Sequence, residues 1–349
     1  MRIAQVAPLY ESVPPKLYGG TERVVSWLTE ELVREGNDVT LFASADSRTL
    51  AYLEPLVPQG LRLDPGCRDP LAHHMIAVDR VAARAHRFDV IHFHTDYLHF
   101  PVSRLLSVPH LTTLHGRLDL PDLQPLFRHF CDVPLVSISN NQRAPLPMAN
   151  WQATVHHGLP PEHFAFGAGD GGYLAFLGRI SPEKRPDRAI AIAIATGMPL
   201  KIAAKVDPVD REYFEARIRP LLRHPLVEFI GEIGDSDKAE FLGKAAALLF
   251  LIDWPEPFGL VMIEAMACGT PVIGWRCGAV PEVVEEGKTG FIVDSIESAA
   301  AAVARLGEFD RAACLQAFEA RFCARRMARD YLAVYQAVID RMDATAVAI

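Results

Sequence analysis

Residues 253–271 hold the densest group of side chains that could do chemistry. Glu256 and Glu264 are eight positions apart, and Gly259 lies between them where a strand and loop give way to a predicted helix. A glycine there allows close backbone approach, and the free N–H groups at a helix start can bind an anion or a hydroxyl group. This spacing separates the two carboxylates too far for a tight catalytic pair. It predicts two hydroxyl-binding carboxylates on either side of a bound phosphate.

Basic side chains follow two other predicted strands. Arg179 and Lys184 come after the predicted strand 174–177, which places them at the carboxyl edge of a sheet. A fork-shaped guanidinium and a compact ammonium together match a diphosphate group. Lys205 follows a later strand and could lie at the same edge. The alternative is that Arg179 and Lys184 form a surface pair beside Glu183.

A glycine pair and a histidine mark a second candidate region. Gly19 and Gly20 follow the first predicted strand and precede a helix that Thr21 would cap, so this loop can approach a phosphate. It lacks the glycine spacing of a dinucleotide fingerprint, which disfavours a dehydrogenase. His115 follows the predicted strand 111–114, also at a carboxyl edge. The alternatives are that Gly19 and Gly20 form an ordinary turn and that His115 has only a structural role.

Two groups of residues suggest metal ligands on spacing alone. His92 and His94 share one face of a strand, with Asp96 just beyond. Asp235 and Asp237 form an Asp-x-Asp pattern, but they precede a helix and are better explained by capping. The six cysteines show no metal or redox spacing and are expected to be buried thiols. A metal site at His92 and His94, with Asp96 and His99 just beyond, therefore stays open on spacing alone.

Alternating strands and helices must position these side chains. Short apolar runs alternate with amphipathic stretches, which predicts parallel sheets covered by helices. Residues 1–157 form one Rossmann-like domain, and residues 170–327 form a second one. The last helix, about residues 328–349, is expected to pack back on the first domain. The prediction is an α/β chain of two doubly wound domains facing a cleft, with ligands at the carboxyl ends of strands.

The composition narrows the class of protein. The 349 residues are 50% hydrophobic and 22% charged, which excludes a disordered chain, a collagen and a coiled coil. A net charge of −8 makes a nucleic-acid binder improbable. No apolar run is long enough to span a membrane, and the first apolar patch is too short for a signal peptide. We expect a cytoplasmic enzyme.

Several segments resemble glycosyltransferase family 4. Residues 253–271 resemble its glutamate–seven residues–glutamate motif. Residues 19–22, 176–184, 278–284 and 287–291 are also similar to that family. The resemblance covers nearly the whole chain and is strongest between residues 174 and 294. It implies the GT-B fold, a nucleotide-sugar substrate, and no resident metal or cofactor.

The resemblance gives each candidate residue a role. Glu264 would hold the ribose hydroxyls of the nucleotide, and Glu256 would hold a hydroxyl of the donor sugar. Arg179 and Lys184 would bind the diphosphate, and His115 would lie beside the donor sugar. The expected catalytic residues are His115, Glu256, Arg179 and Lys184; the expected donor-binding residues are Gly19, Gly20, Arg179, Lys184, Lys205, Glu256, Phe258, Gly259, Leu260 and Glu264.

The implied activity is retaining transfer of a hexose from a nucleotide diphosphate sugar, with UDP-glucose as the first donor to consider. No residue stands out as a covalent nucleophile, so same-face attack is favoured. Two alternatives stay open, a sugar-nucleotide-binding protein without transferase activity and a GT-B-fold epimerase. The acceptor is unknown and could be a sugar, a lipid-linked molecule or a small molecule. Arg80, Arg84 and Arg87 form only a short basic stripe, too little to predict membrane contact.

Overall fold

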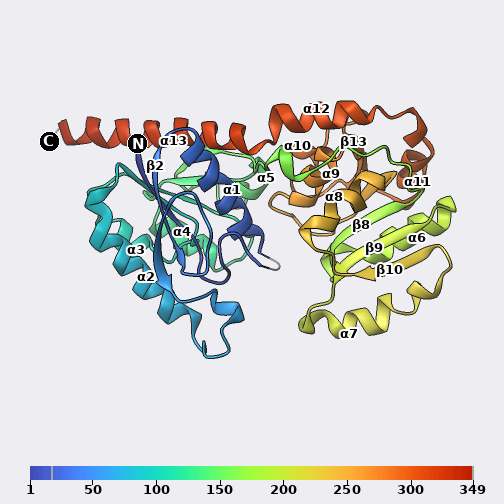
Figure 1. Cartoon of the computed structure of the whole chain (residues 1–349), viewed down its shortest axis with the longest axis horizontal. Helices are drawn as coiled ribbons and strands as arrows, with labels where there is room; N and C mark the ends of the chain where they lie inside the picture. Colours follow the sequence, from blue (N-terminus) through green and yellow to red (C-terminus); the bar gives the residue numbers. More distant parts are fainter. Residues whose placement is uncertain (17–18, 348–349) are drawn as a thin grey trace. The chain divides into compact units, whose positions relative to one another are not determined.

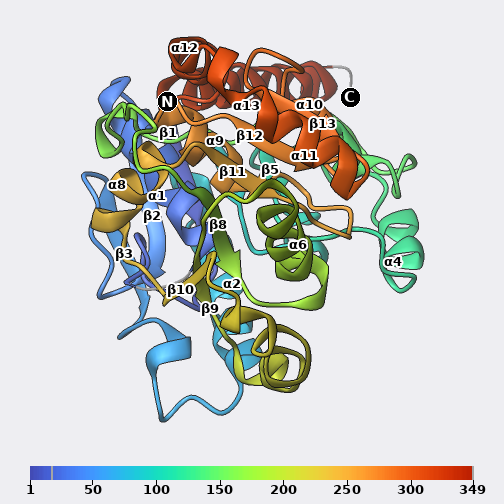
Figure 2. The same ribbon diagram turned by 90° about the vertical axis from the view of Figure 1, so that its right-hand side faces the viewer.

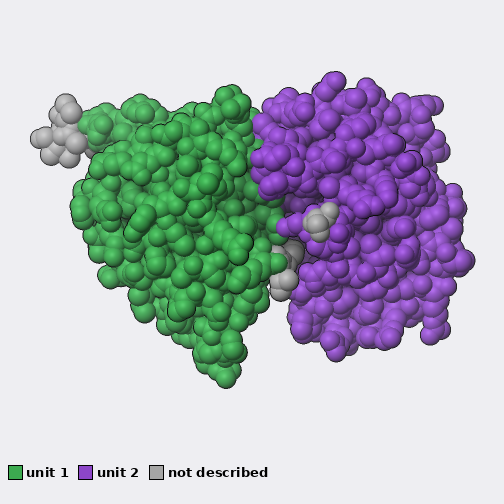
Figure 3. Space-filling view, viewed as in Figure 1, with its two compact units in different colours: residues 1–158, 324–349 green, residues 159–323 purple. Residues whose placement is uncertain are grey.

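The computed structural model describes residues 1–16 and 19–347. The chain divides into two compact units, shown as ribbons in Figure 1 and in separate colours in Figure 3. Unit 1 contains residues 1–158 and 324–349, and unit 2 contains residues 159–323. The sequence places this division between residues 157 and 170, and it assigns the last helix to the first domain.

Unit 1 is built on a seven-stranded parallel sheet with the order β3-β2-β1-β4-β5-β6-β7. Its strands are β1 (Arg2–Val6), β2 (Asp38–Ser44), β3 (Tyr52–Val57), β4 (Val90–Phe93), β5 (His110–Thr113), β6 (Leu135–Ser137) and β7 (Trp151–Thr154). The expected parallel sheet is confirmed. The edge strands β3 and β7 were not predicted, because their residues are mostly half-buried and form no apolar run.

The helices of unit 1 are α1 (Gly20–Arg34), α2 (Pro70–Arg84), α3 (Phe100–Ser103), α4 (Leu123–His129), α5 (Asn140–Arg143) and α13 (Ala324–Val347). Helix α1 buries Val24, Leu28 and Leu32 at helical spacing, and Gly36 follows it with a φ of 84°. Helix α13 packs against α1 and β5, and it buries Tyr331 and Tyr335. The C-terminal helix therefore completes the core of unit 1.

Unit 2 repeats the same topology with six parallel strands in the order β10-β9-β8-β11-β12-β13. They are β8 (Leu174–Arg179), β9 (Leu200–Lys205), β10 (Val227–Gly231), β11 (Ala247–Phe250), β12 (Val272–Trp275) and β13 (Gly290–Val293). In both sheets the strand order reverses beside the first strand. This reversal is where doubly wound sheets bind ligands, at the carboxyl ends of the strands.

The helices of unit 2 are α6 (Pro186–Thr196), α7 (Arg211–Tyr213), α8 (Asp235–Lys244), α9 (Leu260–Ala267), α10 (Val280–Val283), α11 (Ile296–Ala304) and α12 (Arg311–Arg321). Helices α6 and α11 pack side by side, and α9 packs beside α8 and α12 (Figure 2). A regular helix expected over residues 213–222 is instead α7 followed by a π-helical stretch.

None of the helices within residues 1–16 and 19–347 combines the length and the hydropathy that a membrane span requires.

Candidate functional site

The N-terminus of α9 is built as the sequence predicts. Gly259 precedes the helix with a φ of 87°, in the left-handed region that favours glycine. A Cβ on Gly259 would come within 2.8 Å of the Phe250 ring and 2.9 Å of the Met262 methyl group. Both the backbone angle and the packing therefore require glycine here. Leu260 begins the helix directly after it, and Phe258 is buried just before it.

Glu256 and Lys184 are in direct contact. Their side chains form an ion pair, and the Trp254 indole N–H donates a hydrogen bond of 2.9 Å to the same carboxylate oxygen. The Lys184 ammonium also lies 5.5 Å from the centroid of the Trp254 ring. The loop after β8 and the loop after β11 thus place two expected site residues together. Any ligand that binds Lys184 must share the ammonium group with Glu256 or displace the Glu256 carboxylate.

Further contacts hold these two loops against each other. The Asp253 backbone N–H donates to the Glu183 carbonyl oxygen at 2.8 Å, and the Arg185 guanidinium lies 2.7 Å from the Asp253 carboxylate. Arg185 has a φ of 52°, which is strained for a residue with a Cβ. Arg185 directly follows Lys184 in the chain. The residues on either side of Lys184 are therefore both bonded to Asp253 in the loop after β11.

Glu264 has a different basic partner. It lies on α9, its side chain is buried, and one carboxylate oxygen lies 3.3 Å from the Lys238 ammonium on α8. Lys238 also lies 3.2 Å from the Asp235 carboxylate. Helix α8 has Gly234 at its N-cap position, so the expected capping by the aspartates is wrong. Lys238 went unnoticed in the sequence because the Asp-x-x-Lys spacing looks like an ordinary surface pair.

Arg179 and Lys205 lie side by side because β8 and β9 pair in register at these residues. The Arg179 guanidinium lies 2.6 Å from Glu183 and 3.5 Å from both Asp207 and Asp210. Lys205 lies 2.8 Å from Asp207. The expected basic pair is present, but three carboxylates surround Arg179. Burial raises the pKa of Asp210, which the Arg179 charge partly opposes.

His115 lies after β5 in unit 1, as the sequence predicts. Its Nε2 atom is 2.9 Å from His94 Nδ1, and its ring stacks on His157 with centroids 5.4 Å apart. Among the described residues its buried Nδ1 atom has no hydrogen-bond partner. Burial lowers the pKa of His115 to about 3, so the ring is neutral at physiological pH.

His92 and His94 do not form a metal site. Both ring nitrogens of each residue take part in hydrogen bonds with protein groups. Burial lowers the pKa of both rings well below the ordinary value, so they are neutral. Within residues 1–16 and 19–347, no group of histidine, cysteine, aspartate and glutamate side chains could hold a metal ion. The two histidines are part of a hydrogen-bonded core.

The start of α1 at Gly19 and Gly20 differs from the predicted helix cap. Gly19 occupies the N-cap position of α1 and Gly20 is its first residue, so Thr21 does not cap the helix. A Cβ on Gly19 would lie 2.9 Å from Pro15 Cβ and 3.1 Å from a Glu22 carboxylate oxygen. Close packing therefore explains Gly19. A buried Glu22 carboxylate oxygen is among the atoms closest to this position, which does not favour a phosphate here.

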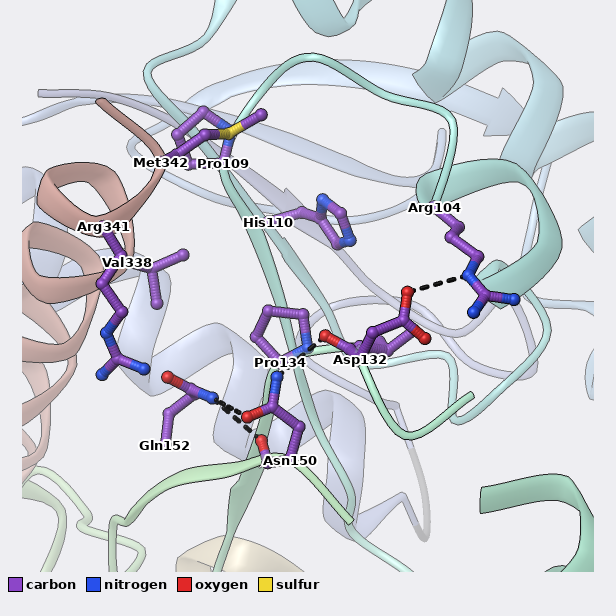
Figure 4. A pocket seen from close by; sticks show the side chains of 11 residues that line it. Arg104, Pro109, His110, Asp132, Pro134, Asn150, Gln152, Val338, Arg341 and Met342 are labelled. Atoms are coloured by element: carbon purple, nitrogen blue, oxygen red, sulfur yellow. Dashed lines mark hydrogen bonds and ion pairs between the residues drawn. The ribbon is translucent and has the colours of Figure 1, made fainter. Parts of the chain in front are cut away.

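A separate pocket of about 270 Å³ lies in unit 1, away from the candidate residues (Figure 4). It is lined at the start of β5 by His110, with Asp132 and Asn150 before β6 and β7, and by Arg341 on α13. These positions belong to the amino ends of the strands, opposite the carboxyl ends that carry His115.

The cysteines differ from the prediction that all six are buried thiols. All six are free, but only Cys268 and Cys314 are buried.

Comparison with known proteins identifies the fold. The structure of AviGT4, a glycosyltransferase involved in avilamycin A biosynthesis, is similar with a TM-score of 0.71 and 24% identity, covering 97% of this chain and 98% of that one. Sucrose-phosphate synthase from Thermosynechococcus elongatus has a TM-score of 0.78 and 19% identity, covering 98% and 100%. Anabaena HepE, solved with UDP, has a TM-score of 0.74 and 18% identity, covering 97% and 100%. With its two parallel sheets, the chain has the α/β GT-B fold.

Family models match both units. The model of glycosyl transferases group 1 matches residues 162–310, and that of glycosyltransferase family 4 matches residues 18–144. The chain therefore belongs to the group 1, family 4 glycosyltransferases, which confirms the resemblance read from its motifs. A D-inositol 3-phosphate glycosyltransferase of Mycolicibacterium smegmatis is 32% identical over 184 residues, 46% of this chain and 39% of the relative. One from Streptomyces scabiei is 34% identical over 146 residues, covering 38% and 32%. The matched part thus spans only about a third of these relatives.

Proposed function

We propose that this protein is a retaining glycosyltransferase that transfers a hexose from a nucleotide diphosphate sugar to an acceptor hydroxyl group. The observation that carries the proposal is the contact between Lys184 and Glu256 beside the N-terminus of α9. A cation for the diphosphate, a carboxylate for a sugar hydroxyl and free backbone N–H groups are brought together there. Membership of a transferase family supports the same activity.

In the proposed reaction the bond between the anomeric carbon and the phosphate oxygen breaks, and its electron pair leaves with the diphosphate. Lys184, Arg179 and the α9 N-terminus would stabilise the charge that develops there. The acceptor oxygen forms the new bond on the same face of the sugar. Its proton passes to the departing phosphate, so no protein nucleophile takes part. No metal ion is required in this scheme, because protein groups carry the neutralising charge.

The substrates are proposed from chemistry and from relatives. A protein of similar fold, HepE, has been solved with UDP-glucose, which supports UDP-glucose as the first donor to test. Relatives named D-inositol 3-phosphate glycosyltransferases make a phosphorylated cyclic polyol one acceptor to test. The six free cysteines suit a reducing compartment, which supports a cytoplasmic location.

A panel of nucleotide sugars tests the activity without knowledge of the acceptor. Each sugar is incubated with the protein, and release of nucleoside diphosphate by slow hydrolysis is measured. We expect release from one donor, and its loss in Glu256→Ala. Binding of nucleoside diphosphate without any release would favour the sugar-nucleotide-binding alternative. Conversion of the donor into a stereoisomer, seen by NMR, would favour the epimerase.

A further inference from the structure

The carboxylate of Glu264 is buried and depends on one basic partner. Only 6% of its side chain is exposed, and its Oε1 atom lies 3.3 Å from the Lys238 ammonium on α8. Within residues 1–16 and 19–347, no other cation forms an ion pair with Glu264. A buried carboxylate without a counter-charge is strongly disfavoured and takes up a proton instead. Lys238 is therefore the group that lets this carboxylate stay charged inside unit 2.

The second carboxylate oxygen of Glu264, Oε2, is open to a ligand. In the described part of the chain no hydrogen bond reaches Oε2, and the atom is not one of the buried polar atoms that lack a partner, so solvent contacts it. Glu264 lies in the second turn of α9, which begins after the carboxyl end of β11. This is the edge of the sheet at which doubly wound domains bind ligands. A charged oxygen there accepts hydrogen bonds from hydroxyl groups and repels phosphate.

Lys238 lies between two carboxylates that differ in exposure. Its ammonium is 3.2 Å from Asp235, whose side chain is 56% exposed, and 3.3 Å from the buried Glu264. Charges attract each other more strongly where water does not screen them, so the Lys238 charge acts mainly on Glu264. Asp235 belongs to the Asp-x-Asp pattern of the sequence, and it holds the lysine from the solvent side.

The other titratable side chains around Glu264 do not neutralise it. Burial, together with the Glu264 charge, raises the pKa of the Cys268 thiol on α9 to about 12, so the thiol stays uncharged. Arg311 on α12 donates to three backbone carbonyl groups and a threonine hydroxyl. On α8, Glu240 and Lys244 pair with each other at the surface. Strands β11 and β12, which also contact α9, carry no titratable side chain.

We propose that Lys238 is a positioning residue that keeps Glu264 ionised and oriented, so that Oε2 accepts hydrogen bonds from the ribose hydroxyl groups of the nucleotide. A protonated carboxyl group offers only neutral hydrogen bonds, which are about half as strong as charge-assisted ones. Without Lys238 the buried group would take up a proton at a higher pH, and ribose binding would weaken as the pH falls. The identification of the hydroxyl groups as those of a ribose rests on the proposed function.

The charge of Glu264 can be followed on the full chain without any ligand. Glutamate side chains are labelled with ¹³C at Cδ, and Glu264 is assigned from the signal lost in Glu264→Gln. We expect this signal to titrate at a higher pH in Lys238→Met than in the wild-type protein. Lys238→Arg, which keeps the positive charge, should titrate like the wild type. The same titration in Lys238→Met and in the wild type would overturn the proposal, whatever the protein binds.

Nucleotide binding provides a second readout. The probe is UDP, or the nucleoside diphosphate that the nucleotide-sugar panel identifies, titrated by calorimetry at pH 6 and at pH 8. We expect Lys238→Met to bind it roughly tenfold more weakly than the wild type at pH 6 and less than about threefold more weakly at pH 8, because the carboxyl group loses its proton between these values. Lys244→Met removes an exposed lysine of the same helix and should match the wild type at both values. An equal loss for Lys238→Met at both values would contradict a role through Glu264.

A nucleotide without ribose hydroxyl groups separates this role from direct binding of the diphosphate by Lys238. The 2′,3′-dideoxy form of the same nucleotide offers Glu264 no hydroxyl group, so the wild type and Lys238→Met should bind it equally to within about twofold. An equal loss for both nucleotides in Lys238→Met would contradict the proposal and make Lys238 a ligand of the diphosphate. If no nucleoside diphosphate binds, the proposed function fails, while the ¹³C titration still decides whether Lys238 controls the charge of Glu264.

Discussion

The two units place opposite kinds of chemistry at the same edge of the same topology. In unit 1, the carboxyl ends of β1, β4 and β5 carry neutral, buried side chains whose hydrogen bonds run from one residue to the next. In unit 2, the loops after β8, β9 and β11 carry charged side chains in partly exposed ion pairs. The shared strand order therefore determines where a site forms, and the side chains determine what it binds.

The two units should also differ in how far their side chains rearrange when a ligand binds. A partly exposed ion pair contributes little free energy, so its members can exchange partners when a ligand arrives. A buried hydrogen-bonded network costs more to break, because each lost partner leaves a desolvated polar group. We expect the unit 2 pairs to rearrange around a diphosphate and the unit 1 network to keep its geometry. The predictions below test both halves of this comparison.

Glu256→Ala should produce the largest effect. Loss of the carboxylate removes the contact assigned to the transferred sugar, and turnover should fall about 10²- to 10³-fold. Nucleoside diphosphate affinity should stay within about twofold, because the lost contact is assigned to the sugar and not to the nucleotide. Donor hydrolysis and calorimetry measure the two quantities. The control is Glu228→Ala, which removes an exposed carboxylate of β10 that pairs with Lys201.

Glu264→Ala should instead weaken nucleotide binding. Its carboxylate is assigned to the ribose, and loss of a charge-assisted hydrogen bond there should cost about 1.5–3 kcal/mol. Calorimetry with free nucleoside diphosphate measures this loss. Glu240→Ala on α8, which removes the exposed partner of Lys244, is the matched control. If Glu256→Ala loses nucleotide binding while Glu264→Ala keeps it, the assignment along this motif is reversed.

The buried histidines should make unit 1 sensitive to acid. Burial lowers the pKa of His99 well below its ordinary value of 6.5, so only the unfolded chain takes up a proton near pH 6. Stability is then complete above about pH 6.5 and falls as the pH falls, by about 1.4 kcal/mol per pH unit for each such group. His99→Gln should reduce this slope by that amount.

Hydrogen exchange measured between pH 7 and pH 5 reports the two units separately. The slope of protection with pH should become shallower in peptides of unit 1 in His99→Gln, while peptides of unit 2 keep their wild-type slope. His129→Gln, at an exposed position, serves as the control. An unchanged slope in unit 1 would show that His99 does not stay neutral in the folded protein.

Asp210→Asn should change nucleoside diphosphate affinity less than Glu264→Ala does, and in the opposite direction. Asp210 competes with a diphosphate for Arg179, so neutralising it should tighten nucleoside diphosphate binding by about two- to fivefold. Calorimetry at low and high salt measures the change, which should shrink as salt rises. Weaker binding in Asp210→Asn would mean that Asp210 orients Arg179 for the ligand rather than competing for it.

Chelation should have the smallest effect. Because Arg179, Lys184 and the α9 N-terminus are assigned the charge of the leaving diphosphate, donor hydrolysis in EDTA should stay within about twofold of the untreated rate. Magnesium and manganese are added back as controls. Full loss of turnover in EDTA that either metal restores would contradict the metal-free scheme.

Much of unit 2 could be predicted because its signals are local. The run from Asp253 to Pro271 determines its own loop, glycine and helix, and Gly259 has the backbone angle that its place in the sequence implies. The positions of Arg179 and Lys205 follow from strand ends, since parallel pairing brings those ends together. The half-buried edge strands β3 and β7 carried no such signal and were missed.

The sequence by itself therefore determined the fold class, which depends on periodicity, and the residues of the motif, which depend on spacing within one segment. Its resemblance to a known family indicated the family. Only the tertiary structure decided which polar side chains meet. Lys238 with Glu264, Asp207 and Asp210 with Arg179, and Tyr335 with Gln5 come from segments far apart along the chain. No local pattern encodes such contacts. They arise when sheet register and helix packing bring separate elements to one edge, and there each buried polar group must find a partner.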